Sequence, residues 1–210
     1  FYTIFTQAWQ ISAVEEFESK DAGEFFSSVL KATLNALFVG VAILTLFSKL
    51  LVHVLSTSAY YSAWQIVPWL SLAVLYSSAS SFLGTVYTSS MKTGALFTTT
   101  MIGAIINVLM NLIMIPVFGV VGAGVGAAVS FLAVSLLRIR GSRKFVDITV
   151  KWFTPIASQI LILVEIYLLH ATNNVFSYVG LLLIVGMIII INIRPFIPLL
   201  KKSIQLIKHR

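Results

Sequence analysis

The sequence predicts an all-α polytopic membrane protein, and three observations support this fold class. First, 59% of the 210 residues are hydrophobic and only 10% are charged, against about 25% charged residues in an ordinary soluble domain. Second, six stretches approach the ~20 apolar residues that a helix needs to cross a bilayer. Third, 13 of the 14 Lys and Arg residues fall on one side of six alternating spans. The composition excludes a soluble enzyme, a nucleic-acid-binding domain and a disordered chain.

The six predicted spans cover residues 34–55, 63–88, 95–115, 120–137, 153–169 and 175–193. A further apolar segment, 1–14, is too short to cross the bilayer and is typical of the end of a helix, so we expect the chain to be a fragment. Between the third and fourth spans, Pro116 is expected to stop the helix and Gly119 to permit the turn. Minimal turns here and at 170–174 predict closely paired antiparallel helices.

Most charged residues lie in the connections between the spans. Cytoplasmic loops are enriched in Lys and Arg, so the side with 13 of these residues is predicted to be cytoplasmic. Only Lys49 lies on the external side. The apolar stripes of 24–33 and of the tail predict amphipathic helices on the membrane surface. The predicted organisation is the end of a truncated helix at 1–14, a cytoplasmic loop with an interfacial helix at 15–33, four transmembrane helices at 34–137, a basic cytoplasmic loop at 138–151, two transmembrane helices at 152–193 and a basic amphipathic cytoplasmic tail at 194–210.

Nothing in the residue pattern predicts an enzyme, a cofactor or a metal site. The chain has no Cys, and its three His residues are far apart in sequence. The acidic cluster within 15–24 matches no calcium-binding loop and is interpreted as a solvated loop. Gly122 and Gly126, four residues apart within an apolar span, predict a face where two helices pack closely.

Polar side chains inside the predicted spans are the candidate functional residues. Such residues either hold helices together or line a wet cavity. Lys49 either extends to the interface or meets an anionic headgroup in a cavity. Glu165 is the only acid within a span and the candidate for ion coupling, although its place near the outer end of its helix would let it reach water. The cavity or substrate candidates are Lys49, Trp64, Gln65, Trp69, Ser77, Ser81, Asn107 and Asn111.

Three stretches carry a family resemblance: FTQAWQISAVEEFESKDAGEFF (5–26), AWQIVPWLSLAVLYSSASSFLGTVYTSSMKT (63–93) and IGAIINVLMNLIMIPVFGVVGAGVGAAVS (102–130). Over residues 1–150 the chain resembles the C-terminal half of bacterial Wzx-type oligosaccharide flippases, the polysaccharide transporters of the MOP (MATE-like) exporter superfamily. The resemblance implies a MATE/MOP-like helical bundle. In it, this fragment supplies the C-terminal lobe plus two extra terminal helices.

The resemblance also implies a function, which is the flipping or export of a polyprenyl-pyrophosphate-linked oligosaccharide for surface polysaccharide biosynthesis by alternating access. The implied partners are the lipid bilayer, the lipid-linked oligosaccharide, polysaccharide polymerase and glycosyltransferases, and not nucleic acid. The implied location is the bacterial plasma (inner) membrane, with multiple passes and a cytoplasmic C-terminus.

Two other functions stay open. A MATE-type cation-coupled exporter of small molecules predicts an acid deep in a cavity helix. A membrane-embedded glycosyl- or acyltransferase predicts a loop with catalytic Asp or His residues, and the sequence offers no such loop.

Overall fold

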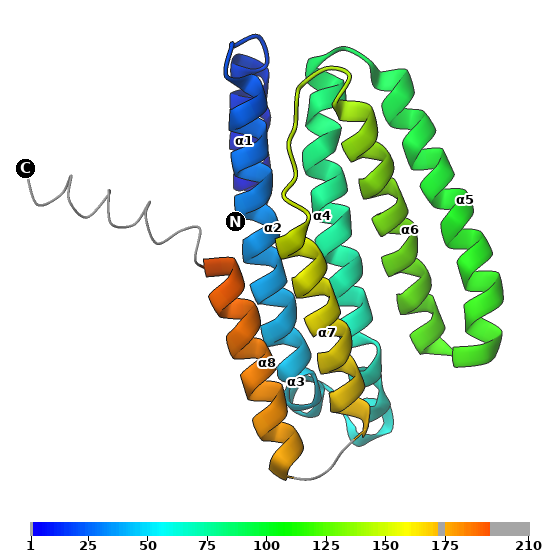
Figure 1. Cartoon of the computed structure of the whole chain (residues 1–210). Helices are drawn as coiled ribbons and strands as arrows, with labels where there is room; N and C mark the ends of the chain where they lie inside the picture. The colour runs from blue at the N-terminus through cyan, green and yellow to red at the C-terminus, as the bar shows by residue number, and fades with distance from the viewer. Residues whose placement is uncertain (1, 172–174, 194–210) are drawn as a thin grey trace, which may run out of the picture. The chain divides into compact units, whose positions relative to one another are not determined.

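The computed structural model describes residues 2–171 and 175–193, and every regular element within them is a helix (Figure 1). Five of these helices, α2 and α4 to α7, are long and apolar enough to cross a membrane, and α8 adds a shorter described apolar stretch. The predicted all-α membrane architecture is therefore confirmed. The predicted tail at 194–210 and part of the turn at 170–174 lie outside the described residues.

The helices are α1 Tyr2–Glu16, α2 Ala22–Leu46, α3 Ser48–Leu55, the 3₁₀ helix η1 Ser58–Gln65, α4 Val67–Ser89, α5 Thr93–Phe118, α6 Val120–Ser142, α7 Phe153–Ala171 and α8 Val175–Ile193.

The helices form two units, each described by itself. The first unit comprises Phe1–Lys31 and Gln65–Val150, and the second comprises Ala32–Trp64 and Lys151–Arg210. Within the first unit, α6 packs against both α4 and α5, and α1 contacts α4. Within the second unit, α7 and α8 pack as an antiparallel pair (Figure 1).

Glycines set the close approach of α5 and α6, as the sequence predicted. Gly119 alone joins the two helices, and its φ of +57° is a conformation that glycine adopts without strain. A Cβ on Gly122 would overlap the Met114 carbonyl of α5. The expected helix stop at Pro116 was wrong, because α5 continues through it to Phe118. Pro116 lies in the last turn, where its missing N–H removes only one backbone hydrogen bond.

Residues 24–33, expected as a separate interfacial helix, are the first turns of the long helix α2. Phe26 and Leu30 are buried, and they face protein. The Trp9 ring stacks on Phe82 with the centroids 4.3 Å apart and meets Phe26 edge-on. Its indole nitrogen donates a 3.1 Å hydrogen bond to Thr85. Nothing in 24–46 breaks the helix, since this stretch contains no proline.

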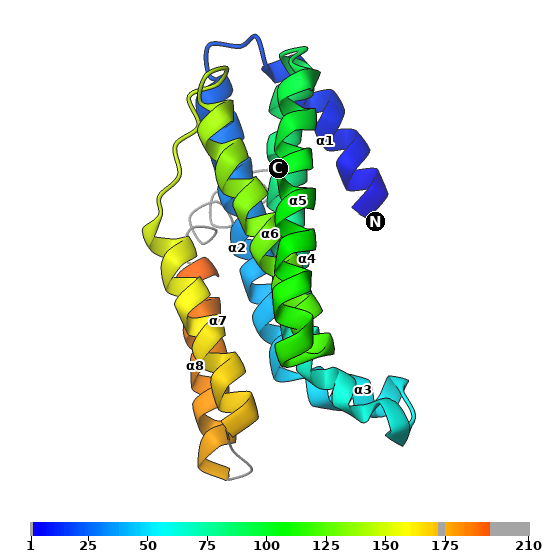
Figure 2. The same ribbon diagram turned by 90° about the vertical axis from the view of Figure 1, so that its right-hand side faces the viewer.

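In the second unit, the predicted span at 34–55 forms parts of two helices. Helix α2 ends at Leu46, the backbone departs from helical geometry at Phe47, and α3 begins at Ser48. Figure 2 shows α3 turned out of the line of α2. The predicted span at 63–88 likewise begins later, at Val67, with Pro68 in its first turn where proline is tolerated. These helices therefore start and end at different residues from those expected.

Replacing Gly122 by alanine tests the close packing of α5 on α6. The added methyl would meet backbone, which cannot rotate away, so we expect Gly122→Ala to lower the free energy of unfolding by about 1–3 kcal/mol. Gly40→Ala is the matched control, because nothing lies within 4 Å of a Cβ there, and it should stabilise by up to about 1 kcal/mol. Unfolding of both variants in detergent micelles measures the difference. If both variants change the free energy of unfolding equally, the close packing at Gly122 is contradicted.

Candidate functional site

A buried arginine joins three helices of the first unit. Arg138, in the last turns of α6, is only 7% exposed. Its Nη1 donates to the Ser80 carbonyl of α4 at 2.8 Å, and its Nε and Nη2 donate to the Thr99 and Thr100 hydroxyls of α5 at 3.2 and 2.8 Å. All three acceptors are neutral oxygens, so the positive charge is solvated by dipoles.

The neighbouring residues make room for this guanidinium. On α4, Gly84 has no side chain, and a Cβ there would lie 3.2 Å from Arg138 Nη1. The Tyr87 hydroxyl approaches the Arg138 carbonyl at 3.4 Å. The position near the C-terminal end of α6 also favours a cation, because the helix macrodipole is negative there. Helix α6 continues to Ser142, into the stretch predicted as the cytoplasmic loop at 138–151.

Two of the candidate cavity residues form a hydrogen-bonded group between α5 and α6. Asn111 Nδ2 donates to Asn107 Oδ1 at 3.1 Å, and Asn107 Nδ2 donates to the Ser130 hydroxyl at 3.1 Å. A Cβ on Gly126 would lie 2.7 Å from Asn111 Oδ1. Asn107 therefore links α5 to α6 by a hydrogen bond, and Asn111 donates to Asn107 from within α5.

The remaining candidates of the first unit are spread along α4 and the segment before it. Trp69 packs against α6, because a Cβ built on Gly124 would lie 3.0 Å from the Cβ of Trp69. Ser77 is half-buried and Ser81 is exposed one turn later, while Gln65 is half-buried at the end of η1. The other two candidates, Lys49 and Trp64, belong to the second unit.

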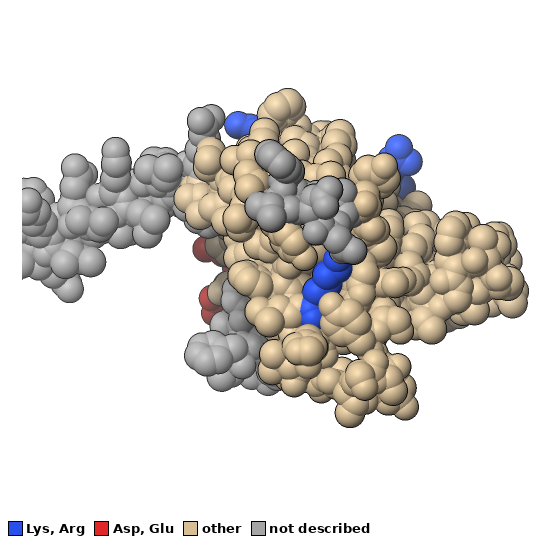
Figure 3. Space-filling model, turned by 90° about the horizontal axis from the view of Figure 1, so that it is seen from below, with Lys and Arg blue, Asp and Glu red and all other residues tan. Residues whose placement is uncertain are grey.

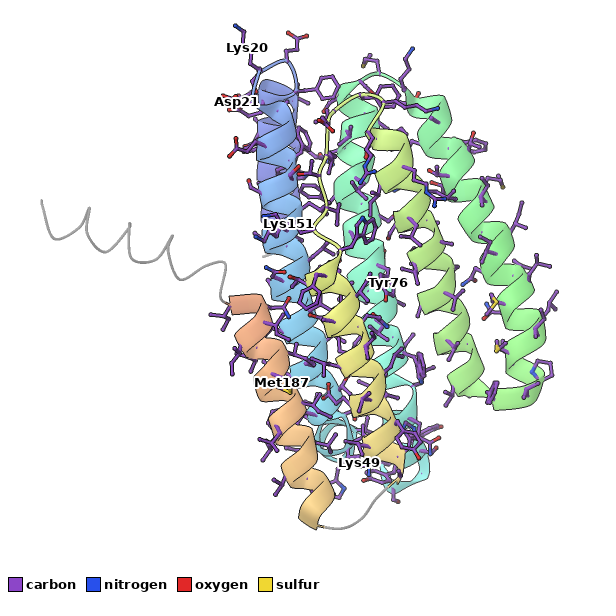
Figure 4. All side chains as sticks on the ribbon, viewed as in Figure 1. Lys20, Asp21, Lys49, Tyr76, Lys151 and Met187 are labelled. Atoms are coloured by element: carbon purple, nitrogen blue, oxygen red, sulfur yellow. The ribbon has the colours of Figure 1, made fainter. Side chains whose placement is uncertain are left out.

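Lys49 lies at one end of the second unit (Figure 4), where it contacts Trp64. Lys49 Nζ donates to the Leu169 carbonyl at 3.0 Å and lies 4.5 Å from the centroid of the Trp64 ring. The Trp64 ring is in turn 4.7 Å from the His170 ring, centroid to centroid. The structure thus brings together two predicted residues and adds His170, which the sequence analysis did not select.

Glu165 is fully buried in α7, contrary to the expectation that it reaches water. Neither carboxylate oxygen has a hydrogen-bond partner among the described residues. Further along the same buried face, Ser158 accepts a 2.8 Å hydrogen bond from Asn192 of α8. The sequence analysis missed this pair, although its polar residues inside apolar helices were a usable signal.

No group of three or more His, Cys, Asp or Glu residues within 2–171 and 175–193 could hold a metal ion. Comparison with protein-family models, with curated proteins and with solved structures finds no match at the significance required.

Replacing Arg138 by lysine tests its role between the three helices. An ammonium cannot make the three directed bonds of the guanidinium, so we expect Arg138→Lys to lower the free energy of unfolding by about 2–3 kcal/mol. Arg140→Lys is the matched control, because Arg140 is exposed two residues away, and it should change stability by less than about 0.5 kcal/mol. Chemical unfolding in detergent micelles compares them. If both variants match the wild type, the contacts of Arg138 contribute nothing to stability.

Proposed function

We propose that this chain belongs to a transporter that flips a polyprenyl-pyrophosphate-linked oligosaccharide across the bacterial plasma membrane by alternating access, for surface polysaccharide biosynthesis. It would supply the C-terminal lobe and two terminal helices of that transporter. Polysaccharide polymerase and glycosyltransferases would act beside it. The protein would be a carrier, with no chemical step of its own.

The observation that carries this proposal is the agreement between the family resemblance and the packing. The stretch with the most specific resemblance, 102–130, covers most of α5, the Gly119 turn and the first half of α6. Its distinctive residues, the Asn pair and the glycines, are those that make the α5–α6 contact. The resemblance therefore follows a packed structural motif, which general apolar composition would not produce.

The buried cation supports an anionic cargo. Arg138 is buried and held by neutral oxygens, whereas Lys49 is half-buried and held by a carbonyl oxygen and an aromatic ring. A positive charge inside an apolar helical bundle is costly, and such residues commonly mark a pathway for substrate or ions. A pyrophosphate group is a cargo whose charge complements both side chains.

A MATE-type exporter driven by a cation is the second candidate function, and Glu165 favours it. This carboxylate is buried in α7 and has no hydrogen-bond partner among the described residues. Intramembrane acids often take part in proton or cation transfer. A small molecule would then be the cargo in place of a lipid-linked sugar.

A reconstituted transport assay tests the proposed function. The full-length protein is placed in proteoliposomes that contain a fluorescent polyprenyl-pyrophosphate-linked oligosaccharide, and an impermeant quencher reports the leaflet that holds the lipid. We expect protein-dependent movement between leaflets, with no movement in protein-free vesicles. Export of small organic cations without lipid movement would support the second candidate. Sugar or acyl transfer by the purified protein would contradict both.

The variant Glu165→Gln separates the two transporter functions. If the protein is a flippase in which Glu165 is structural, lipid movement and protein level should stay close to those of the wild type, because Gln has nearly the same shape. Glu24→Gln is the control, since Glu24 is exposed in the first turn of α2. Loss of transport driven by an ion gradient, at normal protein level, would favour the cation-coupled exporter.

Cysteine labelling tests the predicted orientation, since the native chain has no Cys. Thr57, Thr93 and Lys144 are all exposed, so a cysteine at each can react. The excess of Lys and Arg predicts that a membrane-impermeant maleimide labels the cysteine at 57 in intact cells. The cysteines at 93 and 144 should react only after the cells are permeabilised. The opposite pattern would reverse the topology.

A further inference from the structure

A single cation marks one end of the second unit. Lys49 is the only Lys or Arg between Ala32 and Trp64. It lies in the first turn of α3, where the chain leaves the line of α2. Seen from the end of the molecule at which α3 lies, the surface is mostly uncharged, with a short run of Lys or Arg atoms crossing it (Figure 3). The surroundings of this cation are therefore the first place to look for an anion partner.

The contacts of Lys49 hold its ammonium in place without neutralising it. The ammonium donates one hydrogen bond, to the Leu169 carbonyl at 3.0 Å. The Trp64 ring, 4.5 Å away, attracts the charge through its π face. A lysine ammonium has three N–H donors, so two remain for another acceptor. Six of the seven acids of the chain lie at 15–24 and 147, in the first unit.

His170 adds a second nitrogen group beside the same tryptophan. Its Nδ1 lies 2.8 Å from the Ile166 carbonyl. A carbonyl oxygen only accepts, so Nδ1 carries a hydrogen, and Nε2 can donate to a phosphate oxygen when the ring is the imidazolium, in which both nitrogens are donors. The side chain is exposed. The Trp64 ring thus neighbours both the Lys49 ammonium and the His170 imidazole, whose ring centroid lies 4.7 Å from its own.

The neighbouring surface is suited to the boundary between lipid tails and headgroups. On α3, Leu50, Val54 and Leu55 are exposed, and so are the aromatic residues Tyr60 and Tyr61 of η1. Exposed aliphatic side chains favour acyl chains, whereas Tyr and Trp concentrate at the headgroup level of a membrane. A ligand of this surface should combine an apolar chain with a polar head.

We propose that Lys49, Trp64 and His170 form a binding site for the phosphate group of a membrane lipid. The two free donors of the ammonium would bond to phosphate oxygens, with the Leu169 carbonyl and the tryptophan face fixing the direction of the side chain. The phosphate can come from a polyprenyl pyrophosphate or from an anionic phospholipid. The first source rests on the proposed function, and the second does not.

Lipid binding by the purified full-length protein in neutral detergent tests the site. The probes are undecaprenyl pyrophosphate, phosphatidylglycerol and undecaprenol, which has the isoprenoid chain without phosphate. Native mass spectrometry gives each dissociation constant. We expect the wild type to bind at least one phosphate-bearing lipid and to bind undecaprenol no better than background. If undecaprenol binds as tightly as both phosphate-bearing lipids, the inference is wrong.

Variants identify the residues that bind the phosphate. Lys49→Met should weaken the affinity for the phosphate-bearing lipid about tenfold, because a charge-assisted hydrogen bond is lost, and Lys49→Arg should restore most of it. Lys92→Met is the matched control, because Lys92 is an exposed lysine of the first unit, and it should bind like the wild type. Unchanged affinity in folded Lys49→Met would overturn the inference.

A second variant leaves the hydrogen bond between Lys49 and Leu169 in place, in case the loss of that bond unfolds Lys49→Met. Trp64→Leu removes the aromatic face alone and should weaken phosphate-lipid binding about threefold. Wild-type affinity in this variant would count against the site.

Flipping by Lys49→Met is assayed separately. Loss of lipid binding with normal flipping supports a phospholipid site, and undiminished binding overturns the inference while leaving the proposed function intact.

Discussion

The first unit depends on how a full positive charge is accommodated among apolar helices. Arg138 is only 7% exposed, and its charge is solvated by a backbone carbonyl of α4 and two hydroxyls of α5. Each directed bond requires a particular distance between helices, so one side chain of α6 sets the spacing of both its neighbours. The absent side chain of Gly84 and the close Tyr87 are consequences of the same requirement.

Elsewhere the helices are joined by small groups of neutral polar atoms. Lipid tails give no hydrophobic drive for one apolar helix to leave them for another, so close van der Waals contact and interhelical hydrogen bonds decide the packing. The Asn107–Ser130 bond and the glycines of α6 do this in the first unit. The Asn192–Ser158 bond does it in the second. Glu165 differs from these residues because its oxygens remain without partners among the described residues.

Composition and charge distribution were sufficient to predict the helical membrane class and the approximate place of each span. Helix ends were harder, because the sequence from 24 to 46 has no signal that separates an interfacial helix from the start of a span. The burial of Arg138 had a signal that was overlooked, since 122, 126, 130, 134 and 138 follow one helix face at four-residue intervals. The contacts of Lys49 with Leu169 and of Trp64 with His170 had none, because they depend on how distant segments pack.

The glycine turn between α5 and α6 bears on how the protein is made. One residue with a φ of +57° joins helices of 26 and 23 residues, so the contacts beside the turn, such as that of Gly122 with Met114, connect positions that are near in sequence. Pairing two such helices costs little loop-closure entropy and needs no other part of the chain. During synthesis this hairpin can therefore enter the bilayer already paired, hiding its asparagines from lipid before the later helices emerge from the ribosome.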